Sequence, residues 1–307
     1  MPGKVFISCG QAFPAEKEIA AQISDWLKGE GYAPYVAIEA QSIQDVNSGI
    51  IGKLKSADYY IFIDFRREKI HRCPREYRGS LFTNQELAVA HYLHFDEAIF
   101  LQQSKVKLEG SGNYMLSNAK RFDSSNEVLE IVEQEIKKRK WTPNYSRHLV
   151  PVSINILTQP MQYGDHTGAR NQYICHVGIE NKRNDVAAFS TIAFLDYIEL
   201  PSKQTIAPDS SYLKWVGLSA NGLLGYQRAI LPGRSEKFDA FAIDSNLHNS
   251  VYLHSAADLY PRQPILQNTL GQHILHYQVF AIDFPVLNFE VVLDITSNIT
   301  TTTVKIV

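Results

Sequence analysis

The chain has 307 residues, of which 45% are hydrophobic and 20% charged, and its formal net charge is -2 at pH 7. This length and composition can build more than one hydrophobic core, so we expect two globular domains. A nearly neutral chain lacks the global field that would attract nucleic acid or an anionic membrane, and we expect neither as a partner.

The cysteines and the N-terminus predict a cellular location. Cys9, Cys73 and Cys175 form no close-spaced pair, and their odd number favours a reducing compartment. The opening residues MPGKVFISCGQAF lack the apolar run and cleavage site of a signal peptide. Nor does any stretch approach eighteen uninterrupted apolar residues. We therefore expect a soluble, cytoplasmic protein with no membrane contact.

The first half of the chain alternates short apolar runs with helical patterns. Apolar runs predict strands at 5–7, 35–38, 59–63 and 98–101. Apolar residues spaced three and four apart predict a helix after each of the first three strands and a last one from Ser124 to Lys140. Alternating strands and helices indicate a parallel, doubly wound α/β sheet of flavodoxin-like type, covered by helices on both faces.

After residue 150 the apolar period drops to two. Val152, Ile154 and Ile156 alternate with polar residues, and further runs of this kind are separated by turn signals such as Asn-Gly and Pro-Gly. This pattern predicts an antiparallel, immunoglobulin-like β-sandwich. We place the two domains at 1–142 and 150–307, with a hinge between Trp141 and Ser146.

Three segments of the first domain follow predicted strands, where parallel sheets bind ligands. They are Ser8 to Phe13, Ala37 to Asp45 and Asp64 to Asn84. The first lacks the spaced glycines of a dinucleotide fingerprint or phosphate loop, but its residues are small and polar. A ligand can therefore approach its backbone closely, and the candidate binding residues there are Ser8, Cys9, Gly10 and Gln11. Cys9 is also readable as a small buried hydrophobe.

The segment GSLFTNQELAVAHYL, residues 79–93, contains a candidate catalytic carboxylate, Glu86. Thr83-x-x-Glu86 also fits a capping box, in which Thr83 begins a helix and Glu86 bonds back to its N–H. A carboxylate at a helix start is favoured by the helix dipole, and the N–H groups there would keep it ionised at neutral pH. The residues by themselves leave both interpretations open.

Several motifs of the first 140 residues resemble a TIR (Toll/interleukin-1 receptor) domain. These are FISCGQ at the first strand end, KSADYYIFI at the third strand and SLFTNQE opening the next helix. In the NAD-cleaving prokaryotic members a serine, an aromatic residue, a small residue and the catalytic glutamate are spaced as Ser80, Phe82, Thr83 and Glu86 are here. Phe82 replaces the more usual tryptophan, and AIEAQSIQDVNSG departs from the family's loop after the second strand.

The resemblance implies roles for these residues. Glu86 would contact the ribose of NAD, which is a substrate here and not a cofactor, and its anion would stabilise an oxocarbenium-like ribose. Ser80 would bond a ribose hydroxyl, or else is a turn residue. Phe82 would stack on the substrate, or else belongs to the core. Arg66, with Arg67, would meet phosphates, or else forms a solvated basic patch.

No metal site is predicted. His71-x-Cys73 and His91-x-x-His94 resemble fragments of one, but no further histidine or cysteine cluster completes four ligands. His273 and His276 lie in a predicted strand, where their odd separation places them on opposite faces.

The function that follows from the resemblance is NAD cleavage by a TIR-like hydrolase in antiviral or stress immunity, activated by assembly. The first domain would self-associate, and the sandwich would recognise an unknown activating ligand or protein. The segment Ala37 to Gly49 would then act as the switch.

Two alternatives remain. The first half also resembles the nucleoside deoxyribosyltransferases through Ala57-Asp58 and Glu86. Otherwise it is a non-enzymatic adaptor, in which Glu86 is only a helix cap.

Overall fold

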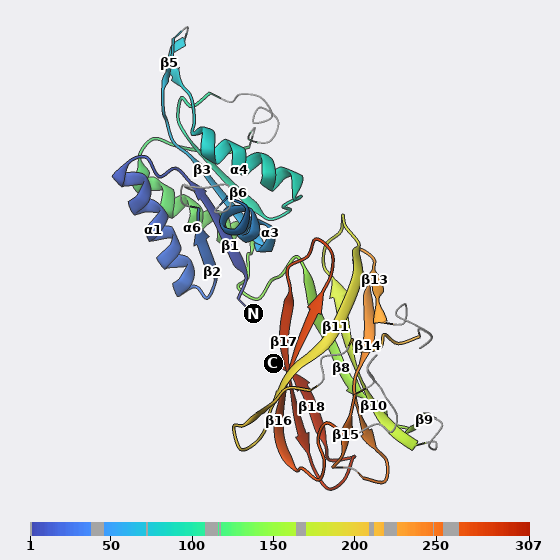
Figure 1. Ribbon diagram of the computed structural model, residues 1–307. Coiled ribbons are helices and arrows are strands. Elements are labelled where there is room, and N and C mark those ends of the chain that lie inside the picture. The colour runs from blue at the N-terminus through green and yellow to red at the C-terminus, as the bar shows by residue number, and fades with distance from the viewer. Residues whose placement is uncertain are drawn as a thin grey trace. The chain divides into compact units, whose positions relative to one another are not determined.

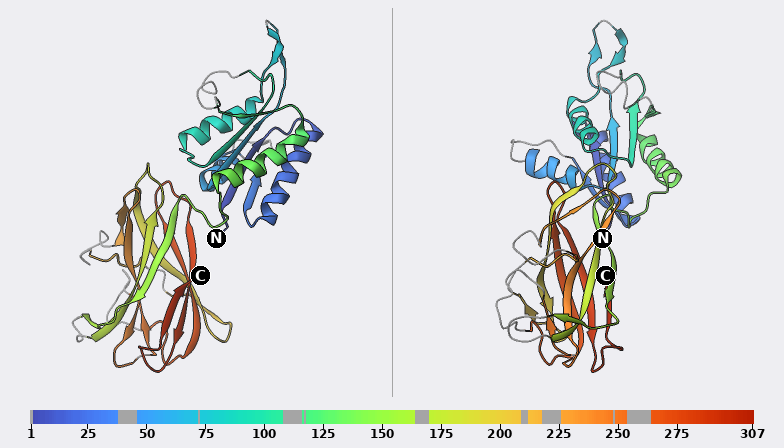
Figure 2. Two further views of the ribbon diagram at one scale, coloured as in Figure 1. Left: turned by 180° about the vertical axis from the view of Figure 1, so that it is seen from behind. Right: turned by 90° about the vertical axis from the view of Figure 1, so that its right-hand side faces the viewer.

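The chain folds into two compact units, Met1–Ser146 and Arg147–Val307 (Figures 1 and 2). This computed structural model describes residues 2–37, 46–71, 73–107, 116, 118–163, 170–208, 212–217, 226–247, 249–253 and 264–307. The division between the units falls at the end of the segment that the sequence marks as a hinge. No helix of the described residues is long and apolar enough to cross a membrane.

The first unit is built on a five-stranded parallel sheet. In spatial order its strands are β2 (Ala33–Val36), β1 (Lys4–Cys9), β3 (Tyr59–Asp64), β6 (Ala98–Gln103) and β7 (Lys120–Phe122). Counted along the chain this is the order 2-1-3-4-5, one of the two common orders of doubly wound sheets. The prediction of a parallel α/β sheet is confirmed.

Helices cover both faces of this sheet (Figures 1 and 2). On one face α1 (Pro14–Gly29) and α6 (Val128–Arg139), which follows the 3-10 turn η2 (Ser125–Glu127), share a core cluster with Ile7 and Ile61. On the other face, a second cluster joins Phe6 and Phe62 to three elements. These are the π-helical turn η1 (Val46–Ile51), α3 (Gly52–Ser56) and α4 (Leu81–Tyr92).

Alternation along β1 determines which candidate residues can meet. Val5, Ile7 and Cys9 pack with α1 and α6, whereas Phe6 packs with α3 and α4. Successive side chains of a strand point to opposite faces, so Ser8 faces α4 while Cys9 faces α1. Neighbours in the sequence are thus separated by the full thickness of the sheet.

Three details of the first unit differ from the sequence prediction. The second strand begins two residues earlier than expected, at Ala33, because Gly31 turns the chain at a φ of 87° and β2 then pairs with β1 from Lys4 onward. The short edge strand β7 and the hairpin of β4 (Lys69–Ile70) and β5 (Cys73–Tyr77) are not predicted at all. They are too short and too charged to show a period.

The second unit consists of two antiparallel sheets, as predicted. The first sheet contains β15 (Val251–Tyr252), β14 (Ser235–Asp244), β10 (Arg170–Asn181) and β8 (Leu149–Ile156), with β9 (Met161–Tyr163) paired to β10. The second contains β12 (Thr205–Ile206), β11 (Ala188–Glu199), β16 (Gly271–Phe280), β17 (Leu287–Ile295) and β18 (Thr303–Ile306), with β13 (Arg228–Ile230) paired to β11.

One hydrophobic core joins the two sheets of the second unit. Trp215, Phe238 and Tyr277 are fully buried in it, and the Tyr277 hydroxyl donates to the carbonyl of Ala240 on the facing sheet at 3.2 Å. His273 is buried and His276 is only partly so, as expected for opposite faces of β16. The immunoglobulin-like assignment of this unit stays a prediction.

Candidate active site around Glu86

Helix α4 begins three residues earlier than the capping-box interpretation requires. Ser80 is the N-cap, and its Oγ accepts from the backbone N–H of Thr83 at 3.4 Å. The N–H of Ser80 is in turn held by Asp64 Oδ1 at 2.8 Å, which anchors the helix start to the end of β3. Glu86 therefore lies in the second turn of α4, so its interpretation as a helix cap is wrong.

The Glu86 side chain points instead to the sheet. Its residue is only 4% exposed, and the Ser8 hydroxyl donates to its Oε2 at 2.5 Å. Oε1 is buried and has no hydrogen-bond partner within the described part of the chain. One carboxyl oxygen is thus fixed by a residue 78 positions away in the sequence, and the other makes no hydrogen bond with the described residues.

Burial raises the pKa of Glu86 to about 8, although the hydrogen bond from Ser8 opposes the shift. An ionised carboxylate loses its hydration when it is buried, and a single hydroxyl does not replace that hydration. The expectation that helix N–H groups keep Glu86 ionised is therefore wrong. Burial therefore favours the protonated form of Glu86 compared with a glutamate in water.

Two tyrosines lie close enough to this carboxyl to feel its charge. Tyr60 is fully buried on β3, and its hydroxyl has no hydrogen-bond partner among the described residues. Burial, and secondly the charge of Glu86, raise its pKa well above the usual value. On β2 the same two causes raise the pKa of the partly exposed Tyr35. We call Ser8, Tyr35, Tyr60 and Glu86 the Glu86 cluster.

Neither tyrosine is among the site residues predicted from the sequence. Tyr60 lies in a run that predicts an apolar strand, although a fully buried tyrosine usually needs a partner for its hydroxyl. The sequence does contain a signal for Tyr60, which is a tyrosine hydroxyl within the otherwise apolar run YYIFI.

The other residues of the first loop lie on the opposite face of the sheet or bond locally. Cys9 is buried against α1, its thiol contacts the Glu16 carbonyl at 3.7 Å, and burial raises its pKa far above the usual value. A protonated, buried thiol is unreactive, so the hydrophobe interpretation fits its geometry. Gln11 Nε2 donates to the carbonyl of Cys9 at 3.3 Å.

The partly buried Arg67 and the buried Glu16 form an ion pair beside Gly10. Arg67 Nη2 bonds Glu16 Oε2 at 2.9 Å, and Nη1 bonds the second carboxyl oxygen. A Cβ at residue 10 would lie 2.1 Å from Arg67 Nη2, so any other residue there would displace the guanidinium from this position. Glu16 also accepts from the backbone N–H of Ala12 at 2.9 Å. The loop after β1 is therefore held by this pair.

The remaining predicted residues all have partners within the protein. Arg66 donates through Nε to the Ser104 carbonyl at 2.6 Å, and its guanidinium lies 5.5 Å from the ring centre of Tyr77. Ser80 is a helix cap, and Phe82 packs partly buried against the core beneath α4. These contacts agree with the structural alternatives, and contact with a ligand stays a prediction for each residue.

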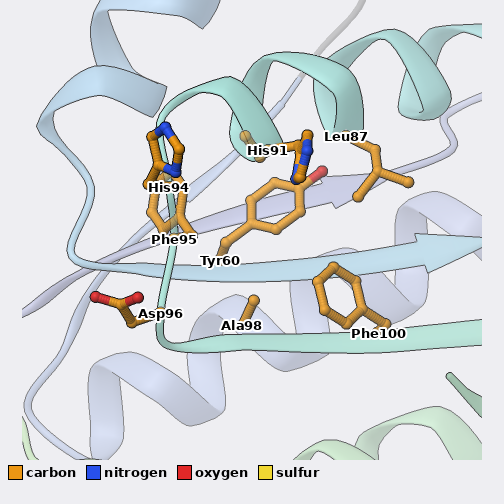
Figure 3. A pocket seen from close by; sticks show the side chains of 9 residues that line it. Tyr60, Leu87, His91, His94, Phe95, Asp96, Ala98 and Phe100 are labelled. Atoms are coloured by element: carbon orange, nitrogen blue, oxygen red, sulfur yellow. The ribbon is translucent and has the colours of Figure 1, made fainter. Parts of the chain in front are cut away.

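A cavity of ≈ 430 Å³ lies elsewhere, beside the last turns of α4 (Figure 3). It is lined by Tyr60, Leu87, Ala90, His91, His94, Phe95, Asp96, Ala98 and Phe100. Only Tyr60 belongs to both this cavity and the Glu86 cluster. The described residues contain no group of three or more histidine, cysteine or acidic side chains placed to hold a metal ion.

No protein-family model matches this sequence, and no curated protein matches it significantly. Among solved structures, the chain is similar to a 2-deoxyribosyltransferase from Bacillus psychrosaccharolyticus, with 14% identity and a TM-score of 0.28. The match covers 41% of this chain and 90% of that one. A β-glucosidase from Listeria innocua has 10% identity and a TM-score of 0.28, over 94% of this chain and 45% of that one. Similarities this low carry no argument about activity.

Proposed function

We propose that the first unit hydrolyses the N-glycosidic bond of NAD, with Glu86 as the catalytic residue. The observation that carries this proposal is the buried carboxyl of Glu86, bonded by Ser8 on one oxygen and unpartnered on the other within the described residues. The resemblance of Ser80 to Glu86 to the TIR motif supports it. So does the location of Ser8, which lies near the carboxyl end of β1, where doubly wound sheets bind ligands.

The chemistry needs one anion. The bond between ribose C1′ and the nicotinamide nitrogen breaks, and its electron pair neutralises the positive charge of the ring, so no acid is required. Ionised Glu86 stabilises the positive charge that develops on the ribose. Water then bonds to C1′ and releases its proton to solvent. Because NAD brings a positive ring close to the carboxyl, its binding favours the ionised form of Glu86 and lowers its pKa below about 8.

A second candidate is favoured by the proton that Glu86 carries. A neutral nucleoside loses its base more easily when an acid protonates the leaving nitrogen, and a carboxyl with a pKa of about 8 is such an acid. Glu86 would donate its proton to the base, and water or a second base would capture the sugar. This is the deoxyribosyltransferase-like alternative.

The direction of the pH dependence separates the two candidates. If ionised Glu86 is the active form, kcat/KM for NAD rises with pH, reaches half of its maximum near pH 8 and levels off above that. If protonated Glu86 is the active form, kcat/KM for base exchange is highest below that pH and falls above it. We would measure nicotinamide release from NAD, and base exchange between a deoxynucleoside and a free base, from pH 5 to 9.

The matched variant for both assays is Glu86→Gln, which keeps the shape and removes the charge and the acid. We expect at least about a hundredfold loss in the reaction that the protein catalyses. If wild type and variant show the same rates for both substrates at equal melting temperature, Glu86 is not catalytic. The adaptor interpretation would then replace the enzyme.

We further propose that the TIR-like unit acts after assembly, in antiviral or stress defence in the cytoplasm, with the sandwich as the recognition unit. The expected switch is the segment Ala37 to Gly49, of which 38–45 lie outside the described residues. An enzyme that requires assembly shows a rate that rises faster than linearly with its own concentration. Strict proportionality from nanomolar to micromolar protein would contradict this part of the proposal.

A further inference from the structure

The cavity beside α4 shares only Tyr60 with the Glu86 cluster, and its other lining residues lie toward the end of α4 and the start of β6 (Figure 3). Tyr60 and Ala98 stand at the amino ends of β3 and β6, and His94 and Asp96 belong to the connection between α4 and β6. The expected NAD site lies at the opposite, carboxyl edge of the sheet. The cavity therefore needs its own explanation.

Aromatic rings and small side chains form the floor of the cavity. The ring of Tyr60 lies 5.6 Å from that of Phe95, tilted by 41°, and 6.4 Å from that of Phe100, at 62°. Ala90 and Ala98 are buried, so the space exists because these two side chains are small. Leucine or valine at either position would fill part of it.

The rim of the cavity is polar. His91, His94 and Asp96 are exposed there, and Figure 3 shows the two imidazoles above the floor. His94 ends the helix with a φ of 51°, and its N–H bonds the carbonyl of His91 at 3.0 Å. Among the described lining residues there is no lysine or arginine, while Asp96 contributes a carboxylate. The rim thus offers hydrogen bonds and negative charge, but no fixed positive charge.

We propose that this cavity binds a planar nitrogen heterocycle of one or two rings, neutral or cationic. Its volume of ≈ 430 Å³ lies toward the small end of the range for ligand sites, about 300–1,000 Å³. The rings of Phe95 and Phe100 are partly exposed, whereas that of Tyr60 is fully buried. Exposed aromatic rings stack on flat rings and attract cationic ones. The imidazoles and Asp96 can bond ring N–H and amide groups, whereas Asp96 repels an anion of the same shape. This binding site does not depend on the reaction proposed for Glu86.

Three probes of one shape test the charge preference: nicotinamide, its ring-methylated cation, and the anion nicotinate. Binding to the full chain is measured by calorimetry. We expect the cation to bind at least as tightly as nicotinamide, and nicotinate to bind at least about tenfold more weakly, because it meets only the like charge of Asp96. Asp96→Asn should reduce the difference between cation and anion.

Two leucine variants on one helix test the location. Ala90→Leu fills the cavity and should weaken binding by at least about tenfold through steric exclusion. Ala88→Leu, on the exposed face of α4, should leave it unchanged. Melting temperatures check that both variants fold, and Ala98→Val replaces Ala90→Leu if that variant does not. Glu86→Gln should keep the binding, which separates this cavity from an NAD site.

Three results would overturn the proposal. They are the absence of binding for all three probes at millimolar concentration, tightest binding of nicotinate, and equal binding by the Ala90→Leu and Ala88→Leu proteins. Loss of binding in Glu86→Gln alone would assign the heterocycle to the Glu86 cluster and would also remove this site.

Discussion

Two of the buried glutamates of the first unit, Glu16 and Glu86, lie on opposite faces of one sheet, and their surroundings differ sharply. Glu16 is 2% exposed, and both of its oxygens bond the guanidinium of Arg67 while backbone N–H groups complete its shell. Glu86 is 4% exposed and receives one hydroxyl from Ser8. A satisfied carboxylate holds a loop in place, whereas a carboxyl with an unpartnered oxygen is costly to keep charged and is available for chemistry.

The largest expected effect comes from replacing Glu16, whose carboxylate oxygens are both hydrogen-bonded. Glu16→Gln removes the charged partner of the partly buried guanidinium of Arg67. The loss of one partner of a fully buried pair costs roughly 3–5 kcal/mol, which is the upper bound for this pair. Urea unfolding should show this as a lower midpoint for the first unit. The double variant Glu16→Gln with Arg67→Met is the control, and it should recover part of the loss. A change below about 1 kcal/mol in the single variant would mean that the pair contributes little.

Replacing Glu86 by glutamine should have the opposite effect on stability from the same replacement at Glu16. In the folded protein the pKa of Glu86 is raised from 4.5 to about 8, so folding binds its proton more tightly than the unfolded chain does. The stability from this group is complete below about pH 4.5 and is lost as pH rises through about 8. Glutamine has no such proton to lose.

Glu86→Gln should therefore gain stability relative to the wild type between pH 5 and 8, by up to roughly 4 kcal/mol. Urea unfolding of both proteins at a series of pH values measures the difference. A difference that is independent of pH would show that Glu86 is already ionised in the folded protein. If the expected gain is found, Glu86→Gln is more stable than the wild type but inactive, which is a common trade-off at catalytic sites.

The smallest effect is expected for Tyr60→Phe. Its hydroxyl is buried without a partner among the described residues, so its removal should change stability by less than about 1 kcal/mol or raise it slightly. If the hydroxyl contacts the substrate together with Glu86, kcat/KM should fall about tenfold with an unchanged folding midpoint. A large loss of stability would instead show that the hydroxyl has a structural partner.

The architecture was readable from the sequence because its signals are local. The continuous apolar run 59–63 gives the central strand β3, and the alternation of Val152, Ile154 and Ile156 gives β8. The strand β7 pairs with β6, and Tyr77 at the end of β5 bridges to Val106, so both contacts join segments that are distant in the sequence. The strands β4, β5 and β7 are also too short and too charged to show a period. Propensity is overridden there by tertiary contacts.

The candidate site was only partly readable, for the same reason. Glu86 was found through its motif, but the motif Thr83-x-x-Glu86 also suggested a cap that is not formed, since Ser80 caps the helix one turn earlier. The pairing of Glu86 with Ser8 joins two elements that only the sheet and α4 bring together. The raised pKa follows from burial, which the sequence of one helix does not show.

Each unit contains one cysteine whose surroundings are described, and its thiol can report the local opening of that unit. Cys9 lies in the core of the first unit and Cys175 in the core of the second, each free of disulfides and fully buried. A thiol reagent reaches such a group only when the surrounding structure opens. With Cys73 replaced by serine, the labelling rates of Cys9 and Cys175 time the opening of each unit separately. If the two units open independently, Cys9 and Cys175 will be labelled at unrelated rates. A partner that binds one unit will lower the labelling rate of the cysteine in that unit only.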